Sequence, residues 1–301
     1  MTGPMFEIWD LLQPLTKFCL YLAMFLAAGG LIFEVLFRHR VPETTQRHVS
    51  RLISIAAWAG LVLVAARLAV AAGSLGGDIA SASDPVLLGL VMKSPLGLSS
   101  VIAGIGFAMI TVIGRVKARG EQAARVVAAA TVLLSLTIVG HATTLGAITG
   151  VLLALHLAGI AFWLGALLPL RQMCGAAGDA DAVGGLADVA DRFGWIAQRV
   201  VAVLVVAGVA YAAILTGSVM TLLTSAYGLT LLAKILLVAG LLGLAARNRF
   251  RIVPALQAGD LTAVLRLRHA IDREILLALA ILVISSLLTS SLTLPMKNMA
   301  Q

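Results

Sequence analysis

Charged residues are scarce in this 301-residue chain, and their scarcity argues against a soluble globular protein. Only 12% of the residues are Asp, Glu, Lys or Arg, whereas 60% are hydrophobic and the mean hydropathy is +1.04. A water-soluble fold of this size cannot cover so much apolar surface with so few charges. We therefore expect the chain to lie in a lipid bilayer.

Several sequence features of other protein classes are also missing. Cys19 and Cys174 are the two cysteines and show no CxxC spacing, so neither a structural disulfide nor a dithiol redox site is expected. No GxxxxGKS or GxxxxGKT sequence occurs, which excludes a P-loop that would couple the protein to ATP. The first ten residues contain no Lys or Arg, so no cleavable signal peptide is expected.

Long apolar runs carry most of the hydropathy. A bilayer core about 30 Å thick is crossed by about 20 apolar residues in a helix. Runs of this length predict an all-α, polytopic membrane protein, a bundle of eight transmembrane helices. The predicted spans are Leu12–Phe37, Leu52–Ala72, Leu96–Val116, Val126–Thr144, Ile148–Leu170, Phe193–Thr216, Leu229–Ala246 and Ile275–Leu294.

The net charge of +8 reflects the orientation of these spans and not a nucleic-acid surface. Most of the 22 Lys and Arg residues fall in alternate loops, and the opposite loops hold only Lys93 and Lys297. Loops rich in Lys and Arg stay in the cytoplasm, so both termini are predicted to be periplasmic, in a bacterial inner membrane. We divide this single membrane unit into a three-span region, residues 1–125, and a region of spans four to eight, residues 126–301.

Two histidines inside predicted spans form a candidate metal site. His141 lies near the outer end of the fourth span, and His156 lies about eight residues into the fifth. The short connection makes these spans adjacent and antiparallel, and about 8–10 Å between helix axes lets two imidazoles meet. Neutral imidazoles bind copper, zinc, iron or nickel. The alternative is that each histidine is a hydrogen-bonded interior residue.

Three sulfur-containing residues are further candidate ligands. Cys19 lies about as deep as His156, so it could complete a three-coordinate site. Met24 and Met109 lie deeper, near or beyond the midplane, and thioethers favour Cu(I). Filling of the apolar core is the alternative role for all three residues.

Two charged residues inside spans are candidates for a transport path, because an ionisable residue in a membrane is costly. Lys234 is predicted at the outer level, paired with a carboxylate such as Asp78 or Asp84. Glu274 is predicted at the inner level, paired with an arginine such as Arg247. Lys234 and Glu274 are too far apart for a salt bridge. Two roles remain open for these residues. They either form ion pairs that hold the helix ends in place, or they relay protons or ions.

The fifth span resembles the CopD family of bacterial copper-resistance membrane proteins, through a histidine followed seven residues later by Trp-x-Gly. The first 130 residues offer no motif of this kind. The motifs, in the order of the family, are Gly140-His141-Ala142, His156 to Trp163 and Gly165, Tyr227 to Lys234 with Arg247-Asn248-Arg249, and Arg268 with Glu274.

This resemblance implies copper ion transport across the inner membrane, as uptake from the periplasm to the cytoplasm, with a periplasmic CopC-like copper-binding protein as partner. Copper would be the substrate, bound at His141 and His156, and no enzymatic activity is expected. One alternative is a membrane oxidoreductase in which the two histidines hold a b-type haem. The other is a non-catalytic membrane partner of a periplasmic copper carrier.

The spacing of the motif residues suggests roles for them. His156 and Trp163 are seven residues apart and share a helix face, so Trp163 could form the floor of an outer cavity. Gly159 and Gly165 would allow close helix approach. Lys234 and Asn248 are fourteen residues apart, again on one face, which is expected to look into the bundle.

Overall fold

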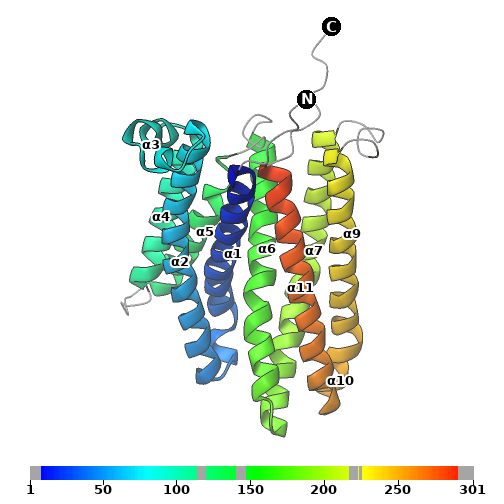
Figure 1. Cartoon of the computed structure of the whole chain (residues 1–301). Coiled ribbons are helices and arrows are strands. Elements are labelled where there is room, and N and C mark those ends of the chain that lie inside the picture. Colours follow the sequence, from blue (N-terminus) through cyan, green and yellow to red (C-terminus); the bar gives the residue numbers. More distant parts are fainter. Residues whose placement is uncertain (1–7, 114–119, 140–146, 217–222, 224–225, 291–301) are drawn as a thin grey trace.

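The computed structural model describes residues 8–113, 120–139, 147–216, 223 and 226–290 as a bundle of long, roughly parallel and antiparallel helices (Figure 1). No strand occurs among these residues. Five helical segments are long and apolar enough to cross a membrane, namely Ile8–Arg40, Glu43–Gly76, Pro95–Ile113, Thr149–Ala176 and Gly228–Gln257. The protein is therefore an all-helical, polytopic membrane protein.

In the N-terminal half, α1 (Ile8–Phe37) is the central helix, and α2 (Glu43–Gly76) and α5 (Glu121–Ser135) pack directly on it. Helix α1 also contacts α6 (Ala147–Ala176) and α11 (Thr262–Ser290) of the C-terminal half. Helix α4 (Pro95–Ile113) packs against α2 and α5. The elements of this half are α1 (Ile8–Phe37), η1 (Arg38–Arg40), α2 (Glu43–Gly76), η2 (Ala80–Ser83), α3 (Pro85–Met92), α4 (Pro95–Ile113) and α5 (Glu121–Ser135).

The C-terminal half surrounds α6, which lies beside α1 in the middle of the bundle (Figure 1). Helix α9 packs on α11, whereas α7 packs on α6 and also contacts α10. The elements of this half are α6 (Ala147–Ala176), α7 (Ala180–Thr216), α9 (Ala226–Arg247), the π-helical turn η4 (Asn248–Ile252), α10 (Val253–Gln257) and α11 (Thr262–Ser290).

Several helices differ in length from the predicted spans, among them α5, α7 and α11. Helix α5 ends at Ser135, whereas the fourth span was predicted to continue to Thr144; its 15 residues are about 22 Å long, shorter than a bilayer core. Helix α7 begins at Ala180, thirteen residues before the predicted span that starts at Phe193. Helix α11 begins at Thr262, thirteen residues before the predicted span.

The early start of α7 has a local cause. The Asp179 carboxylate accepts a hydrogen bond from the Ala182 amide, which satisfies one of the unpaired donors of the first turn. Val183, Leu186 and Ala190 follow at helical spacing and are buried. A run rich in Gly and Asp is thus an amphipathic helical extension that packs against the rest of the protein.

Backbone contact between α1 and α6 sets the centre of the bundle. A Cβ atom at Gly29 would overlap the Ala161 carbonyl, and one at Gly165 would overlap the Gly29 backbone. Only hydrogen at these positions lets the two helices approach so closely, as is typical of helices packed in membranes. The glycine of the Trp-x-Gly motif is therefore a packing residue, as expected.

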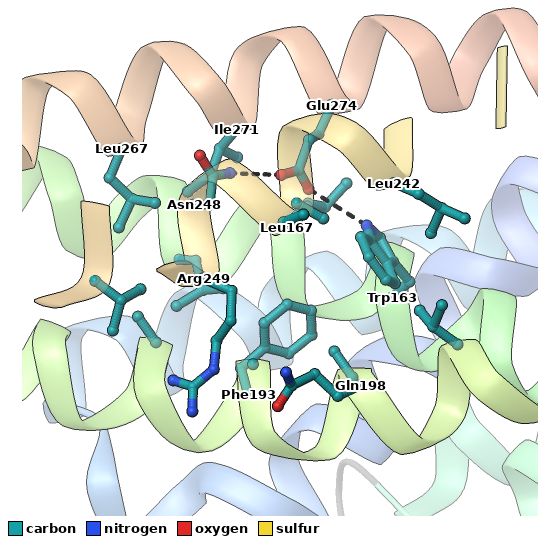
Figure 2. Close-up of a pocket in the computed structure, with 18 of the residues that line it drawn as sticks. Trp163, Leu167, Phe193, Gln198, Leu242, Asn248, Arg249, Leu267, Ile271 and Glu274 are labelled. Atoms are coloured by element: carbon teal, nitrogen blue, oxygen red, sulfur yellow. Dashed lines mark hydrogen bonds between the residues drawn. The ribbon is translucent and has the colours of Figure 1, made fainter. Parts of the chain in front are cut away.

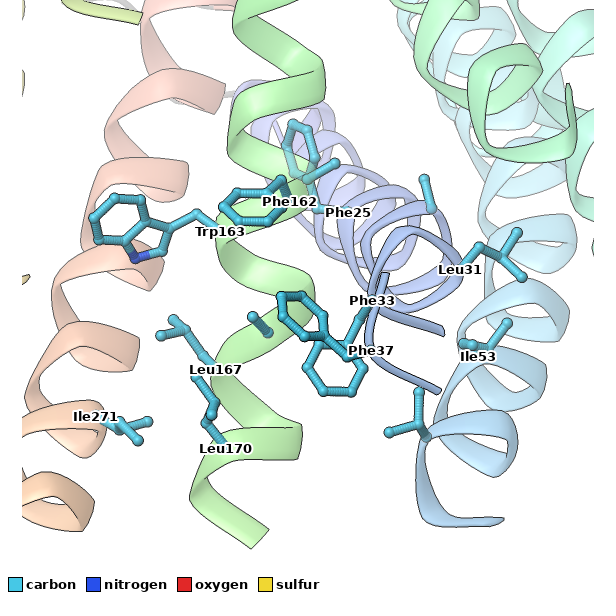
Figure 3. Close-up of a cluster of buried hydrophobic side chains, with 14 of the residues drawn as sticks. Phe25, Leu31, Phe33, Phe37, Ile53, Phe162, Trp163, Leu167, Leu170 and Ile271 are labelled. Carbon is cyan, nitrogen blue, oxygen red and sulfur yellow. The ribbon is translucent and has the colours of Figure 1, made fainter. Parts of the chain in front are cut away.

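Aromatic and aliphatic side chains fill the space around this crossing (Figure 3). Phe33 and Phe37 of α1 stack with their ring centroids 5.0 Å apart, and Leu170 lies near them on α6. Trp163 of α6 points toward α11 (Figure 3), and the neighbouring Phe162 stacks on Phe193 of α7 (Ala180–Thr216) with ring centroids 5.1 Å apart. The two neighbouring aromatic residues of α6 thus both pack against helices of the C-terminal half.

Candidate functional site

A buried hydrogen-bonded cluster joins α6, η4 and α11. The Trp163 Nε1–H donates to Glu274 Oε2 at 3.3 Å, and the Asn248 Nδ2–H donates to Glu274 Oε1 at 2.6 Å (Figure 2). The three residues are all buried, and Glu274 is only 3% exposed. Each carboxylate oxygen thus receives one neutral donor from a different helix.

The π-helical turn explains how Asn248 comes to face Glu274. Residues 248–252 form one wide turn between α9 and α10, and Pro254 follows within the first turn of α10. Proline has no N–H and its ring clashes with the carbonyl four residues earlier, so a regular α-helix is disfavoured there. A wider turn relieves this clash and changes the direction of the side chains before it; such turns often occur at functional sites.

Glu274 makes no salt bridge among the described residues, so the expected pairing with Arg247 is wrong. Arg247 instead lines a separate small cavity of about 160 Å³ together with His269 and Arg273. Arg171 is also occupied, because it pairs with Asp272. The buried carboxylate therefore rests on two neutral donors and not on a cationic side chain.

A cavity of about 290 Å³ adjoins the cluster. Its walls come from α6, α7, α9, η4, α10 and α11 and are mostly apolar, with Trp163, Asn248 and Glu274 at one side (Figure 2). Gln198 and Arg249 line it at another side, and Arg249 forms a salt bridge with Asp191 of α7. The cavity therefore runs from a polar rim to the buried carboxylate.

Phe193 of α7 holds the tryptophan in place. Its ring packs edge-on against Trp163 with centroids 6.0 Å apart, and it stacks on Phe162 at 5.1 Å. The indole N–H is thereby directed at Glu274. Trp163 does lie at the wall of a cavity, as the sequence suggested, but this cavity is the one that Glu274 lines.

His156 lies on the same face of α6 as Trp163, two turns earlier. Its Nδ1 atom is buried and has no hydrogen-bond partner among the residues that the structure describes. An imidazole nitrogen without a partner is free to act as a ligand or as an acceptor. The alternative role, that of an interior histidine held by hydrogen bonds, would require a partner for Nδ1, and the described part of the chain provides none.

Lys234 of α9 is close enough to His156 for the two side chains to interact electrostatically. Its expected pairing with Asp78 or Asp84 does not form. Asp84 caps the first turn of α3, and Asp78 accepts a hydrogen bond from the Ser81 amide at 2.7 Å. These carboxylates lie beside α2 and α3, at the opposite side of the bundle from α9 (Figure 1).

The remaining predicted ligands are not gathered around His156 in the described structure. His141 lies outside the described residues. Met24 is fully buried in the core, and Met109 packs against that core from α4, which contacts α2 and α5. Among the residues described, no group of three or more His, Cys, Asp and Glu side chains could hold a metal ion.

The α1–α6 crossing shows on which side of α6 His156 lies relative to Cys19 of α1. His156 precedes Gly165 by nine residues, or two and a half turns, so it lies on the opposite face of α6. Gly165 faces α1, and His156 therefore faces away from the helix that carries Cys19. Cys19 is a free, partly exposed cysteine, and its role as a ligand stays a prediction.

A second buried polar cluster was not anticipated in this form. Arg125 Nη1 of α5 lies 3.1 Å from Glu34 Oε2 of α1, and the Ser50 hydroxyl of α2 donates to the same carboxylate. Arg125 Nη2 also contacts Glu121 Oε1 at 2.6 Å. The sequence places all these charges at one membrane level, but it does not reveal which of them face each other.

In the cluster of Trp163, Asn248 and Glu274, the role of Asn248 was not predicted from the sequence. The sequence indicated that its helix face looks into the bundle, but not that it would contact Glu274. Its position between two arginines and six residues before Pro254 is the available signal. An amide there is the only side chain of the Arg247-Asn248-Arg249 run that can enter an apolar interior without a charge.

Two family models match the chain. The model described as Copper resistance protein D matches residues 187–288, and the model described as Copper resistance protein D-like, N-terminal domain, matches residues 5–151. The second match extends the likeness into the first 130 residues, where we had found no motif. Searches among curated proteins and among solved structures gave no match.

The two matched ranges cover most of the chain. His156 and Trp163 lie between them, in the α6 segment that joins the matched regions. Asn248 and Glu274 lie within the C-terminal match. Together with the apolar helices, these matches show that the chain is a multi-pass membrane protein of the copper resistance protein D family.

Proposed function

We propose that the protein transports copper ions across the bacterial inner membrane, from the periplasm to the cytoplasm, through a site formed by His156 and His141. The observation that carries the proposal is the buried Nδ1 atom of His156, which has no partner among the described residues. A neutral imidazole without a partner is a good copper ligand. The family membership supports copper as the metal.

The path below His156 follows one face of α6. Trp163 is seven residues further along this face, about 10 Å along the helix, and its indole N–H reaches Glu274. The histidine, the tryptophan and the carboxylate thus form a polar stripe within the C-terminal half of the bundle. Such a stripe offers a cation successive polar contacts inside an otherwise apolar structure.

The proposal includes eight membrane spans with both termini in the periplasm. The alternation of Lys and Arg between loops supports this orientation. We expect a reporter fused after Gln301 to be periplasmic and one inserted at residues 177–179, between α6 and α7, to be cytoplasmic. If both reporters lie in the same compartment, the proposed number of spans is wrong.

The periplasmic side is proposed to receive copper from a CopC-like copper-binding protein, and the protein itself is proposed to have no enzymatic activity. A haem-binding oxidoreductase is the competing function. An absorption spectrum of the purified protein separates the two. A Soret band in protein isolated from the membrane would contradict transport as the primary function and would support the haem assignment.

Copper uptake into proteoliposomes tests the proposal directly. We expect purified protein to admit copper to an internal chelating dye, and His156→Ala to reduce the rate at least tenfold. His48→Ala is the matched control, because His48 is an exposed histidine of α2. Equal uptake by the His156 variant and the control would refute the assigned path.

A further inference from the structure

Glu274 is a buried anionic group placed along the proposed path. It lies beyond Trp163, on the side away from His156, and both of its oxygens accept hydrogen bonds from neutral groups. Removal of a charge from water costs several kcal/mol unless a charge of opposite sign or good hydrogen bonds compensate it. Two neutral donors compensate only part of that cost.

The charged groups around Glu274 are already engaged elsewhere or lie in another cavity. On α6 and α11, Arg171 pairs with Asp272; on α7 and η4, Asp191 pairs with Arg249. From α1, which also packs on α11, Glu34 pairs with Arg125 and Lys17 donates to the Thr289 carbonyl. Of the charged groups on α9 and α11, Arg247, Arg266, His269 and Arg273 line the smaller cavity. Arg268 interacts with Cys174 of α6, and Lys234 interacts with His156.

The adjoining cavity gives Glu274 a route to exchange a cation. It lies against the carboxylate and extends to Gln198, which is exposed, and to Arg249. Asn248 Oδ1, another buried oxygen beside the cavity, has no hydrogen-bond partner within the described residues. An acceptor of this kind can hold a water molecule next to the carboxylate.

We propose that Glu274 is a cation-exchange site in the inner half of the path, which holds a proton from the cavity when the path is empty and releases it when a transported cation arrives. This inference rests on the proposed transport function. In each exchange the carboxyl O–H bond breaks, the proton passes to water in the cavity, and the incoming cation supplies the positive charge. The reverse exchange restores the proton, so the charge of the site stays constant when the transported cation is monovalent, as Cu(I) is.

The ligand chemistry favours an exchange site over a stable copper site. Soft copper ions prefer sulfur and imidazole ligands, whereas carboxylates suit protons and hard cations. A passing copper ion would therefore be attracted by the charge of Glu274 without being trapped. A site that must release its cation toward the cytoplasm benefits from this weak affinity.

The exchange predicts that uptake depends on the pH inside the vesicle. We take displacement of the proton by the arriving cation as the slow step of uptake. A more acidic interior then keeps Glu274 protonated and slows uptake, and a more alkaline interior favours release of the proton and accelerates uptake. The pH of the outer solution should not act through this site. Copper uptake is therefore measured at constant outer pH with acidic, neutral and alkaline interiors.

We expect several-fold faster uptake by the natural protein as the interior becomes alkaline, and no such dependence in Glu274→Gln. Glu274→Asp should retain the dependence. Glu43→Gln is the matched control, since Glu43 is an exposed glutamate of α2 whose contact is with Arg47. Copper affinity of the detergent-purified Glu274→Gln protein should be unchanged, because His156 is intact.

A second variant keeps the test decisive if Glu274→Gln does not fold. Trp163→Phe keeps the ring but removes the N–H that stabilises the anionic carboxylate, so a given rate of uptake should require a more alkaline interior. Uptake by the natural protein that is independent of interior pH would overturn the exchange site while leaving transport intact. Persistence of the dependence in Glu274→Gln would also overturn it, whereas absence of any uptake would refute the transport function instead.

Discussion

Loss of the Arg125 guanidinium should destabilise the N-terminal half of the bundle strongly. Arg125 lies 3.1 Å from Glu34 and 2.6 Å from Glu121, and Glu34 is buried between α1, α2 and α5. In Arg125→Met, the hydrogen bond from Ser50 is the contact that Glu34 keeps among the residues that the structure describes. Breaking a buried ion pair by removing one partner costs about 3–5 kcal/mol, because the other charge is left buried and alone.

The reverse variant should be milder. In Glu34→Gln, Arg125 retains Glu121, and the new amide oxygen can still accept the Ser50 hydrogen bond. We expect a cost of about 1–3 kcal/mol, typical of a weakened buried hydrogen bond. The double variant Glu34→Gln with Arg125→Met should cost less than the sum of the two, because no charge remains unpaired between α1 and α5.

The free energies of unfolding can be measured for the detergent-solubilised protein by titration with a denaturing detergent. Arg40→Met is the matched control. Its partner is Asp188 at 2.7 Å, but both side chains are exposed, at 42% and 57%, so the pair should contribute at most about 1 kcal/mol. Equal destabilisation by Arg125→Met and Arg40→Met would show that the buried cluster does not form as described.

Three further changes test other parts of the structure. Gly165→Ala should cost about 1–3 kcal/mol in the same titration, because its Cβ would overlap α1, whereas Gly243→Ala, with open space around it, should be neutral. Lys234→Met should tighten copper binding several-fold in competition with a chelator, because it removes a positive charge near His156. The hydrogen bonds that Thr262 donates hold the pKa of Asp260 below its ordinary value, so this cap stabilises α11 fully above that ordinary value. The stabilisation is lost as the pH falls through the lowered pKa, and amide exchange at the start of α11 should accelerate there in the natural protein but not in Asp260→Asn.

The positions of the helices were largely predictable because backbone groups in a membrane must be satisfied within each segment. Runs of apolar residues therefore indicated the long helices, and the glycine of the Trp-x-Gly motif indicated close packing. The lengths were less predictable. Helix α5 ends at Ser135 although the apolar run continues, and α7 begins at Ala180 because Asp179 caps a segment that composition alone marks as a loop.

The order of the side chains along each helix was predictable, but their direction around the bundle was not. Seven-residue spacing correctly placed His156 and Trp163 on one face, and the separation of Lys234 from Glu274 agrees with the contact that Asn248 makes fourteen residues after Lys234. The predicted partners of the charged side chains were wrong where several charged groups lie at a similar height along the bundle. A π-helical turn also has no sequence period of its own, so the approach of Asn248 to Glu274 appeared only in the structure.

The amount of copper bound per molecule of purified protein tests the central claim most directly. The natural protein, loaded with copper under reducing conditions and freed of excess metal, is compared with His156→Ala and with the double variant His141→Ala with His156→Ala. We predict that copper is retained by the natural protein and by His48→Ala, is strongly reduced in His156→Ala, and is lost in the double variant. Unchanged copper stoichiometry in a folded double variant would contradict the account.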